Sequence, residues 1–148
     1  MQQQMRNAEM VTQMRSEGFS AHDMRFIRGY KTPVSVAPDL SDASMWLAVK
    51  ESQNALLDKD AGDVTLYMRF DGGPGGKKYA EFKGSSPGQL KFHLWVQKKE
   101  DQKPGSKLWT RMGVYALGPI RKETHHVIKR KRPYETDMAR TASRVSAA

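Results

Sequence analysis

The chain has 148 residues, of which 38% are apolar and 28% are charged, as expected for a single soluble domain with a hydrophobic core. Its formal net charge is +9, and it contains no cysteine, which excludes disulfides, thiolate zinc sites and cysteine nucleophiles. No secretion signal is visible, and no apolar run approaches the roughly 18 residues of a membrane span. These features predict a cytoplasmic or nuclear protein.

The excess positive charge lies in the second half of the chain. Residues 1–60 contain seven Lys and Arg against eight Asp and Glu, whereas residues 61–148 contain 18 against eight. Such segregation predicts a polyanionic partner, which is nucleic acid or, less favoured, an anionic membrane surface.

The first 30 residues are predicted to form a helical arm. Apolar residues near the start recur at helical spacing, and Gly18 suits the C-cap of a first helix. Ser20–Asp23 fits a capping box that opens a second, short helix ending near Gly29. Two prolines between residues 31 and 38 then predict an extended connector or an edge strand.

The clearest helical pattern begins at Ser41 or Asp42 and ends at Leu57. Its apolar residues recur every three to four positions and form one stripe: Met45, Trp46, Val49, Leu56 and Leu57. We expect this amphipathic helix to cover the apolar face of the sheet that follows.

Strand patterns follow the helix and are separated by short turns rich in Gly, Pro and polar residues. Strands are predicted at 63–70, 77–83, 89–99 and 106–117, with a fifth within 123–131. The predicted fold is therefore α+β: an antiparallel four- to five-stranded meander sheet, backed by one amphipathic helix, with an N-terminal helical arm and a basic C-terminal tail.

These elements divide the chain into three parts. Residues 1–30 form the helical arm, residues 31–132 form the α+β core that binds nucleic acid, and residues 133–148 form a polar tail. The tail is expected to be a frayed helix or a disordered segment.

One face of the predicted sheet is aromatic and basic. Successive strand side chains point to opposite faces, so the apolar residues of each strand fall on one side. The other side carries Tyr67, Arg69, Tyr79, Lys83, Lys91, His93, Trp95, Lys107, Trp109, Arg111 and Tyr115. Two alternatives stay open: these rings lie beneath the N-terminal helices or in a homo-oligomer interface. A one-residue bulge would also move a strand's aromatic residues to the other face.

Bases stack on Tyr and Trp, while Lys and Arg neutralise phosphates, so this face suits nucleic acid. A run of four basic residues near the C-terminus suits a phosphate-binding arm better than a nuclear-import signal. The predicted nucleic-acid-binding residues are Tyr67, Arg69, Tyr79, Lys83, Lys91, His93, Trp95, Lys107, Trp109, Arg111, Lys129, Arg130, Lys131 and Arg132.

The sequence offers no catalytic or metal-binding motif that we can defend. The loop Gly72–Gly76 lacks the Gly-Lys-Ser/Thr ending of a phosphate loop. His125 and His126 would face opposite ways in a strand and could not easily share a metal. The acids around Asp63 and Asp71 match no magnesium motif. We therefore predict a protein that is not an enzyme and needs no cofactor or metal.

The favoured function is binding of RNA or single-stranded DNA, largely without sequence preference, by base stacking and phosphate contacts. The alternative is a small viral or nucleoid-type structural protein, such as a coat or matrix protein. Such a protein would self-assemble as a homo-oligomer and contact nucleic acid or membrane through its basic tail.

Overall fold

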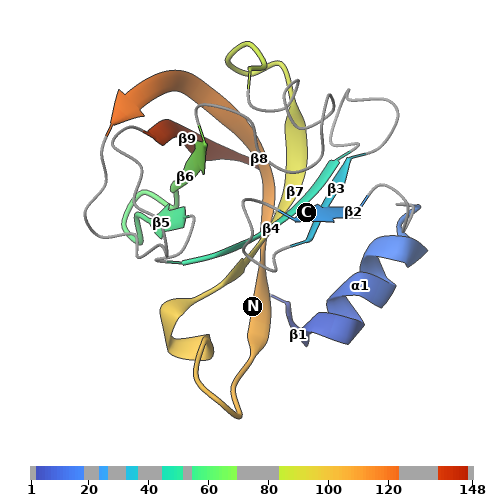
Figure 1. Cartoon of the computed structure of the whole chain (residues 1–148). Coiled ribbons are helices and arrows are strands. Elements are labelled where there is room, and N and C mark those ends of the chain that lie inside the picture. Colours follow the sequence, from blue (N-terminus) through green and yellow to red (C-terminus); the bar gives the residue numbers. More distant parts are fainter. Residues whose placement is uncertain are drawn as a thin grey trace.

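The computed structural model describes residues 3–18, 24–26, 33–36, 45–51, 55–69, 84–123 and 137–146. These segments form a strongly curled β-sheet with an α-helix packed against it (Figure 1). In chain order the elements are β1 (Gln4–Arg6), α1 (Asn7–Ser16), β2 (Met24–Phe26), β3 (Pro33–Val36), β4 (Met45–Lys50), β5 (Ala55–Leu57), β6 (Val64–Arg69), β7 (Lys91–Gln97), a 3-10 turn η2 (Lys99–Asp101), β8 (Leu108–Glu123) and β9 (Asp137–Ser146).

The sheet is mixed, and its strand order does not follow the chain. The order is β2-β3-β4-β7-β8-β9-β6-β5, with β1 paired to β8 outside this path. The pair β4–β7 is parallel, whereas the other strand pairs in the described segments are antiparallel. β8 is the longest described strand: its beginning pairs with β1, its middle with β7 and its end with β9.

The predicted antiparallel meander backed by a helix over 42–57 is wrong. Most of that segment forms β4 and β5. β4 lies between β3 and β7, and Trp46 through Val49 are all buried. A strand buried on both faces gives a continuous apolar run, which a short window cannot distinguish from a helical stripe.

The N-terminal arm and the C-terminal tail of the predicted fold are also corrected. α1 begins and ends close to where the sequence placed the first helix, but Met10 and Met14 are buried against the sheet, so α1 is not a free arm. Residues 24–26, predicted as helical, form β2. Residues 137–146 form β9, which lies between β8 and β6 inside the sheet rather than in a tail.

Three predicted strands are confirmed as β6, β7 and β8, although β8 continues six residues beyond its predicted end at Leu117. The segment predicted as an extended connector or edge strand contains β3, which is flanked by β2 and β4. The strand predicted at 77–83, and residues 124–131 of the predicted fifth strand, lie outside the described residues.

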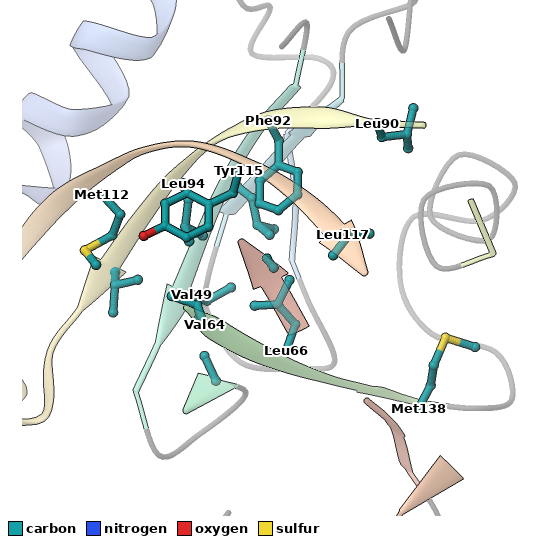
Figure 2. Packing of buried hydrophobic residues seen from close by; sticks show 14 residues of the cluster. Val49, Val64, Leu66, Leu90, Phe92, Leu94, Met112, Tyr115, Leu117 and Met138 are labelled. Atoms are coloured by element: carbon teal, nitrogen blue, oxygen red, sulfur yellow. The ribbon is translucent and has the colours of Figure 1, made fainter. Parts of the chain in front are cut away.

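The concave side of the curled sheet encloses the main hydrophobic core, here called the inner core (Figure 2). Its buried residues are Leu47, Val49, Ala55, Val64, Leu66, Leu90, Phe92, Leu94, Val96, Met112, Tyr115, Leu117, Met138 and Ala142. In β7 the inward residues alternate with outward ones as the two-residue period predicts.

A register shift in the β7–β8 pair changes the alternation in β8. Leu94 pairs with Gly113 but Trp95 pairs with Arg111, so β8 contains one extra residue at this point. Tyr115, predicted on the aromatic and basic face, consequently lies in the inner core. Its hydroxyl donates a hydrogen bond to the carbonyl oxygen of Gly62 at 2.7 Å, which links β8 to the residues just before β6.

The backbones of β8 and β9 approach closely at Gly118. A Cβ atom at this position would lie 2.8 Å from the backbone oxygen of Thr141. The Gly118 carbonyl oxygen accepts hydrogen bonds from Nε and Nη2 of the fully buried Arg140, at 2.9 and 2.6 Å. Arg140 also donates from Nη1 to Ser85 Oγ at 3.1 Å, so one guanidinium joins β9, β8 and the segment before β7.

We predict that Gly118→Ala destabilises the protein, because the new methyl group meets a backbone oxygen that cannot rotate away. Overpacking of this kind costs about 1–3 kcal/mol of unfolding free energy, measurable by urea denaturation. Ser143→Ala, an exposed change on β9, is the control and should alter stability by less than about 0.5 kcal/mol. Equal stability of the Gly118→Ala variant and the wild type would contradict the close approach.

Candidate functional site

An open pocket of about 510 Å³ lies where α1 begins, beside the ends of β4 and β7 and the turn that leads into β8. We call it the basic pocket. Its lining residues are Arg6, Asn7, Lys50, Gln97, Gln102, Gly105, Lys107 and Trp109. A volume of this size falls in the range of small-ligand sites, about 300–1,000 Å³.

The sheet topology brings three cationic side chains to this pocket from distant positions in the chain. The parallel β4–β7 pair places Lys50 directly opposite Gln97, where both strands end. The antiparallel β1–β8 pair places Arg6 opposite Leu108, next in sequence to Lys107. The site is therefore a product of strand register rather than of a local motif.

The described lining of the pocket contains three basic side chains, Arg6, Lys50 and Lys107. No Asp or Glu is among the described residues that line it. The nearby Glu51 carboxylate accepts a hydrogen bond from the Lys99 backbone N–H at 2.9 Å, and Asp101 accepts one from Ser106 Oγ at 2.8 Å. Both acids are buried and hold the turn between β7 and β8. Lys and Arg without lining carboxylates suit an anion, such as a phosphate.

The turn itself is fixed by local structure. Gly105 has φ = +90°, a left-handed conformation that glycine adopts without steric cost. Gln102 donates from Nε2 to the backbone oxygens of Glu51 and Gln97, which ties the turn to the ends of β4 and β7. The pocket wall is therefore held by hydrogen bonds to the sheet.

A second group of residues, the tryptophan cluster, lies on the convex side of the sheet beneath α1. Its buried members are Met10, Met14, Trp46, Ala48, Trp95 and Trp109. The indole rings of Trp46 and Trp95 stack, with centroids 5.2 Å apart and planes inclined by 22°. The methionines of α1 thus cover aromatic rings from β4, β7 and β8 that point away from the inner core.

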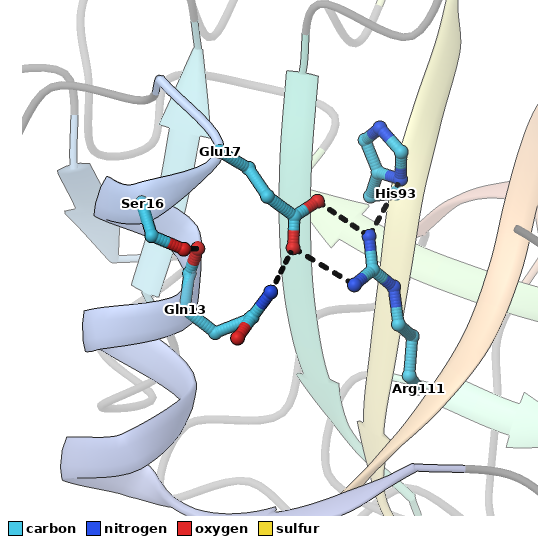
Figure 3. Close-up of polar contacts among 5 residues, drawn as sticks. All are labelled: Gln13, Ser16, Glu17, His93 and Arg111. Carbon is cyan, nitrogen blue, oxygen red and sulfur yellow. Dashed lines mark hydrogen bonds and ion pairs between the residues drawn. The ribbon is translucent and has the colours of Figure 1, made fainter.

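A cation lies against these two rings. The Arg111 Cζ atom is 5.3 Å from the Trp46 ring centroid and 5.5 Å from that of Trp95, within cation–π range. Its guanidinium donates to both carboxylate oxygens of Glu17, which follows α1 (Figure 3). The two donor–acceptor distances are 2.6 and 2.8 Å. Gln13 Nε2 donates to the same carboxylate at 2.8 Å, and His93 Nδ1 lies 3.2 Å from Arg111 Nη2.

These contacts shift two pKa values. Burial raises the pKa of the Glu17 carboxyl, but the hydrogen bonds from Arg111 and Gln13 and the positive charge of Arg111 outweigh it and leave the pKa below its ordinary value. Burial and the positive charge of Arg111 lower the pKa of His93, and the Glu17 charge opposes this only in part. Near neutral pH the group is therefore an ionised Glu17–Arg111 pair beside a neutral imidazole.

Some of the predicted site residues lie at the basic pocket and others at the tryptophan cluster. Lys107 and Trp109 line the basic pocket, although the Trp109 side chain is only 2% exposed. His93, Trp95 and Arg111 lie together beneath the end of α1, where Trp95 is 0% exposed. Trp95 and Trp109 therefore follow the alternative in which the aromatic rings lie beneath an N-terminal helix.

Tyr67 and Lys91 lie outside both places. Tyr67 is buried with Ala139 and Leu56 in a small cluster between β6, β9 and β5. Lys91 is the first residue of β7 and is half-buried, and Arg69 is the last residue of β6. Tyr79, Lys83, Lys129, Arg130, Lys131 and Arg132 lie outside the described residues.

Several residues of these two places are not among those that the sequence predicts. Trp46 and Lys50 fall within the predicted helix over 42–57, because apolar residues on both faces of β4 leave no alternation that marks a strand. Once this segment is a strand, the two side chains share a face. The contribution of Arg6, Glu17 and Gln102 depends on tertiary contacts for which the sequence holds no pattern.

The described segments contain neither a metal-binding cluster nor a membrane-spanning helix. No group of three or more His, Asp or Glu side chains there is arranged to hold a metal ion. α1, with ten residues, is too short to cross a membrane, and no other described helix is long and apolar enough. Comparisons with protein-family models, with curated proteins and with solved structures found no match for this chain.

We predict that the protein loses stability as the pH falls below about 6.5, the ordinary pKa of histidine. Because the pKa of His93 is lower in the folded state, the unfolded chain takes up its proton first, and the stability difference is lost as pH falls through the folded pKa. Urea denaturation at about pH 7.5 and about pH 5 measures it. The loss should be smaller in His93→Gln; an equal loss in both proteins would contradict the assignment to His93.

Proposed function

We propose that the protein binds nucleic acid, RNA or single-stranded DNA, and that the basic pocket holds phosphates of its backbone. The observation behind this proposal is the lining of the pocket, which has Arg6, Lys50 and Lys107 and no carboxylate among the described residues. Charge-assisted hydrogen bonds from Lys and Arg to phosphate oxygens are strong and require no particular base.

The charge of the whole chain supports a polyanionic ligand. A net charge of +9 attracts nucleic acid over distances longer than a single contact, and the pocket adds a defined place for it to bind. The carboxamides of Asn7, Gln97 and Gln102 can donate to phosphate or sugar oxygens. Contacts of this type fix the position of a strand but do not read its sequence, so we propose binding with little sequence preference.

A single strand suits a pocket better than a duplex does. A flexible single strand can insert one nucleotide into the basic pocket, whereas a duplex presents its phosphates on a stiff, regular surface. The described lining contains no carboxylate, imidazole or hydroxyl side chain that could act as a general base or nucleophile. We therefore propose a binding function rather than cleavage of the strand.

The test is a titration of fluorescently labelled oligothymidylate and oligouridylate, followed by anisotropy, at several salt concentrations. Lys107→Glu should weaken binding roughly tenfold or more, because one charge-assisted hydrogen bond contributes about 1.5–3 kcal/mol. It should also reduce the slope of the logarithm of the binding constant against the logarithm of the salt concentration by about 0.7 in magnitude. This is the value for one phosphate contact on a single strand.

Lys59→Glu is the matched control. Lys59 is exposed in the turn between β5 and β6, so the variant makes the same change in net charge without touching the basic pocket. If the two variants bind equally well, the pocket is not the binding site. If the wild type binds neither oligonucleotide at low salt, the proposed function is wrong.

A further inference from the structure

We propose that β1 and α1 together form a removable cover over a second binding site for single-stranded nucleic acid, made by Trp46, Trp95 and Arg111. This inference rests on the proposed function and adds a base-stacking site to the phosphate-binding pocket. In the structure described here the cover is closed, since α1 packs on the indoles and Glu17 holds the guanidinium.

The chemistry beneath α1 resembles a nucleotide site more than an ordinary hydrophobic core. Stacked indoles offer flat surfaces for bases, and the adjacent guanidinium offers paired donors for a phosphate. Arg111 uses these paired donors to bind the Glu17 carboxylate (Figure 3), in the two-bond geometry that it would also make with phosphate. Glu17 thus occupies the place of a phosphate in the closed state.

Two buried donors point to a ligand at this place. Trp95 Nε1 and Arg111 Nε are buried, and neither has a hydrogen-bond acceptor within the described part of the chain. Buried N–H groups are nearly always paired, because an unpaired one loses its hydration without compensation. Base, sugar and phosphate oxygens of a bound strand are acceptors that could reach such donors once the cover has moved.

The cover makes modest contacts with the rest of the molecule. Of the ten residues of α1, Met10 and Met14 are buried, and most of the others are exposed. The Glu17 and Arg111 side chains are 25% and 16% exposed, so water and salt reach the ion pair that holds the end of α1. β1 has three residues and pairs with β8 outside the main strand order.

The cover also connects the two sites. Arg6 and Asn7, at the start of α1, line the basic pocket, and Glu17 follows its last residue. Ten helical residues span about 15 Å, so a short strand anchored in the pocket can reach the tryptophan cluster. Because Arg6 and Asn7 move with the cover, Lys50 and Lys107 are the pocket cations that stay in place, and we expect them to hold the strand while the cover is displaced.

A reversible disulfide between β1 and β8 tests whether the cover moves. Gln4 lies opposite Thr110, and because Arg111 N–H donates to the Gln3 carbonyl, the Gln4–Thr110 pair is a non-hydrogen-bonded pair with close Cβ atoms. The chain has no cysteine, so Gln4→Cys with Thr110→Cys can form a single disulfide. The reduced protein is its own control for folding.

The measurement is made with Trp109→Phe added, so that the remaining tryptophans, Trp46 and Trp95, both report on the covered site. Oligothymidylate should quench their fluorescence in the reduced protein and leave it unchanged in the oxidised one. Oxidised and reduced proteins that respond alike, or a reduced protein that binds without any change in fluorescence, would overturn the proposal.

Glu17→Gln provides a second measurement. Loss of the carboxylate should release Arg111 and raise affinity for oligothymidylate by up to roughly fivefold, the range for a partly exposed ion pair. Glu100→Gln, an exposed change in η2, makes the same change in net charge and is the control. Equal affinity of these two variants would count against the cover.

Lys107→Glu separates the failure of this inference from the failure of the proposed function. If Lys107→Glu weakens binding but the fluorescence of Trp46 and Trp95 never responds to the ligand, the pocket stands and the covered site is wrong. If Lys107→Glu binds like the wild type while the fluorescence responds, the covered site stands and the pocket is wrong.

Discussion

The one-residue shift in the pairing of β7 with β8 decides what each face of the sheet presents. Before the shift, β8 directs Trp109 and Arg111 to the convex side, where they meet Trp46 and Trp95. After it, β8 directs Tyr115 inward to the hydrophobic core. A β-bulge also bends a strand and increases its twist, which agrees with the strong curl of the sheet in Figure 1.

The convex face therefore needs a cover, and α1 provides it at a modest gain in free energy. Complete burial of Met10 and Met14 contributes about 3–6 kcal/mol, and the partly exposed ion pair between Glu17 and Arg111 contributes about 1 kcal/mol or less. Two stacked bases contribute about 2–6 kcal/mol. Since these magnitudes are similar, the proposed exchange of the helix for a bound strand on this aromatic surface requires little net free energy.

The sequence predicted those parts of the fold in which a strand has one buried and one polar face. In β7 the alternation of Phe92 and Leu94 with His93 is visible along the chain, and the structure confirms it. The β4 segment instead predicts a helix, because its apolar run is buried on both faces and shows no two-residue alternation. β9 contains Arg140 among small residues, so its place depends on pairing with β8 and β6. Its local sequence gives no signal for that pairing. The basic pocket depends on strand pairing in the same way, because its cations meet only when the sheet has formed.

The position of β9 also has a consequence for how the protein is made. β6 pairs with β5 on one side and with β9 on the other, and about 70 residues separate β6 from β9 in the chain. At roughly 5–20 residues per second, a ribosome releases β9 on the order of 4–14 s after β6. During that interval β6 has an unpaired edge and the inner core is open on one side. The growing chain is therefore most exposed to edge-to-edge aggregation between the synthesis of β6 and that of β9.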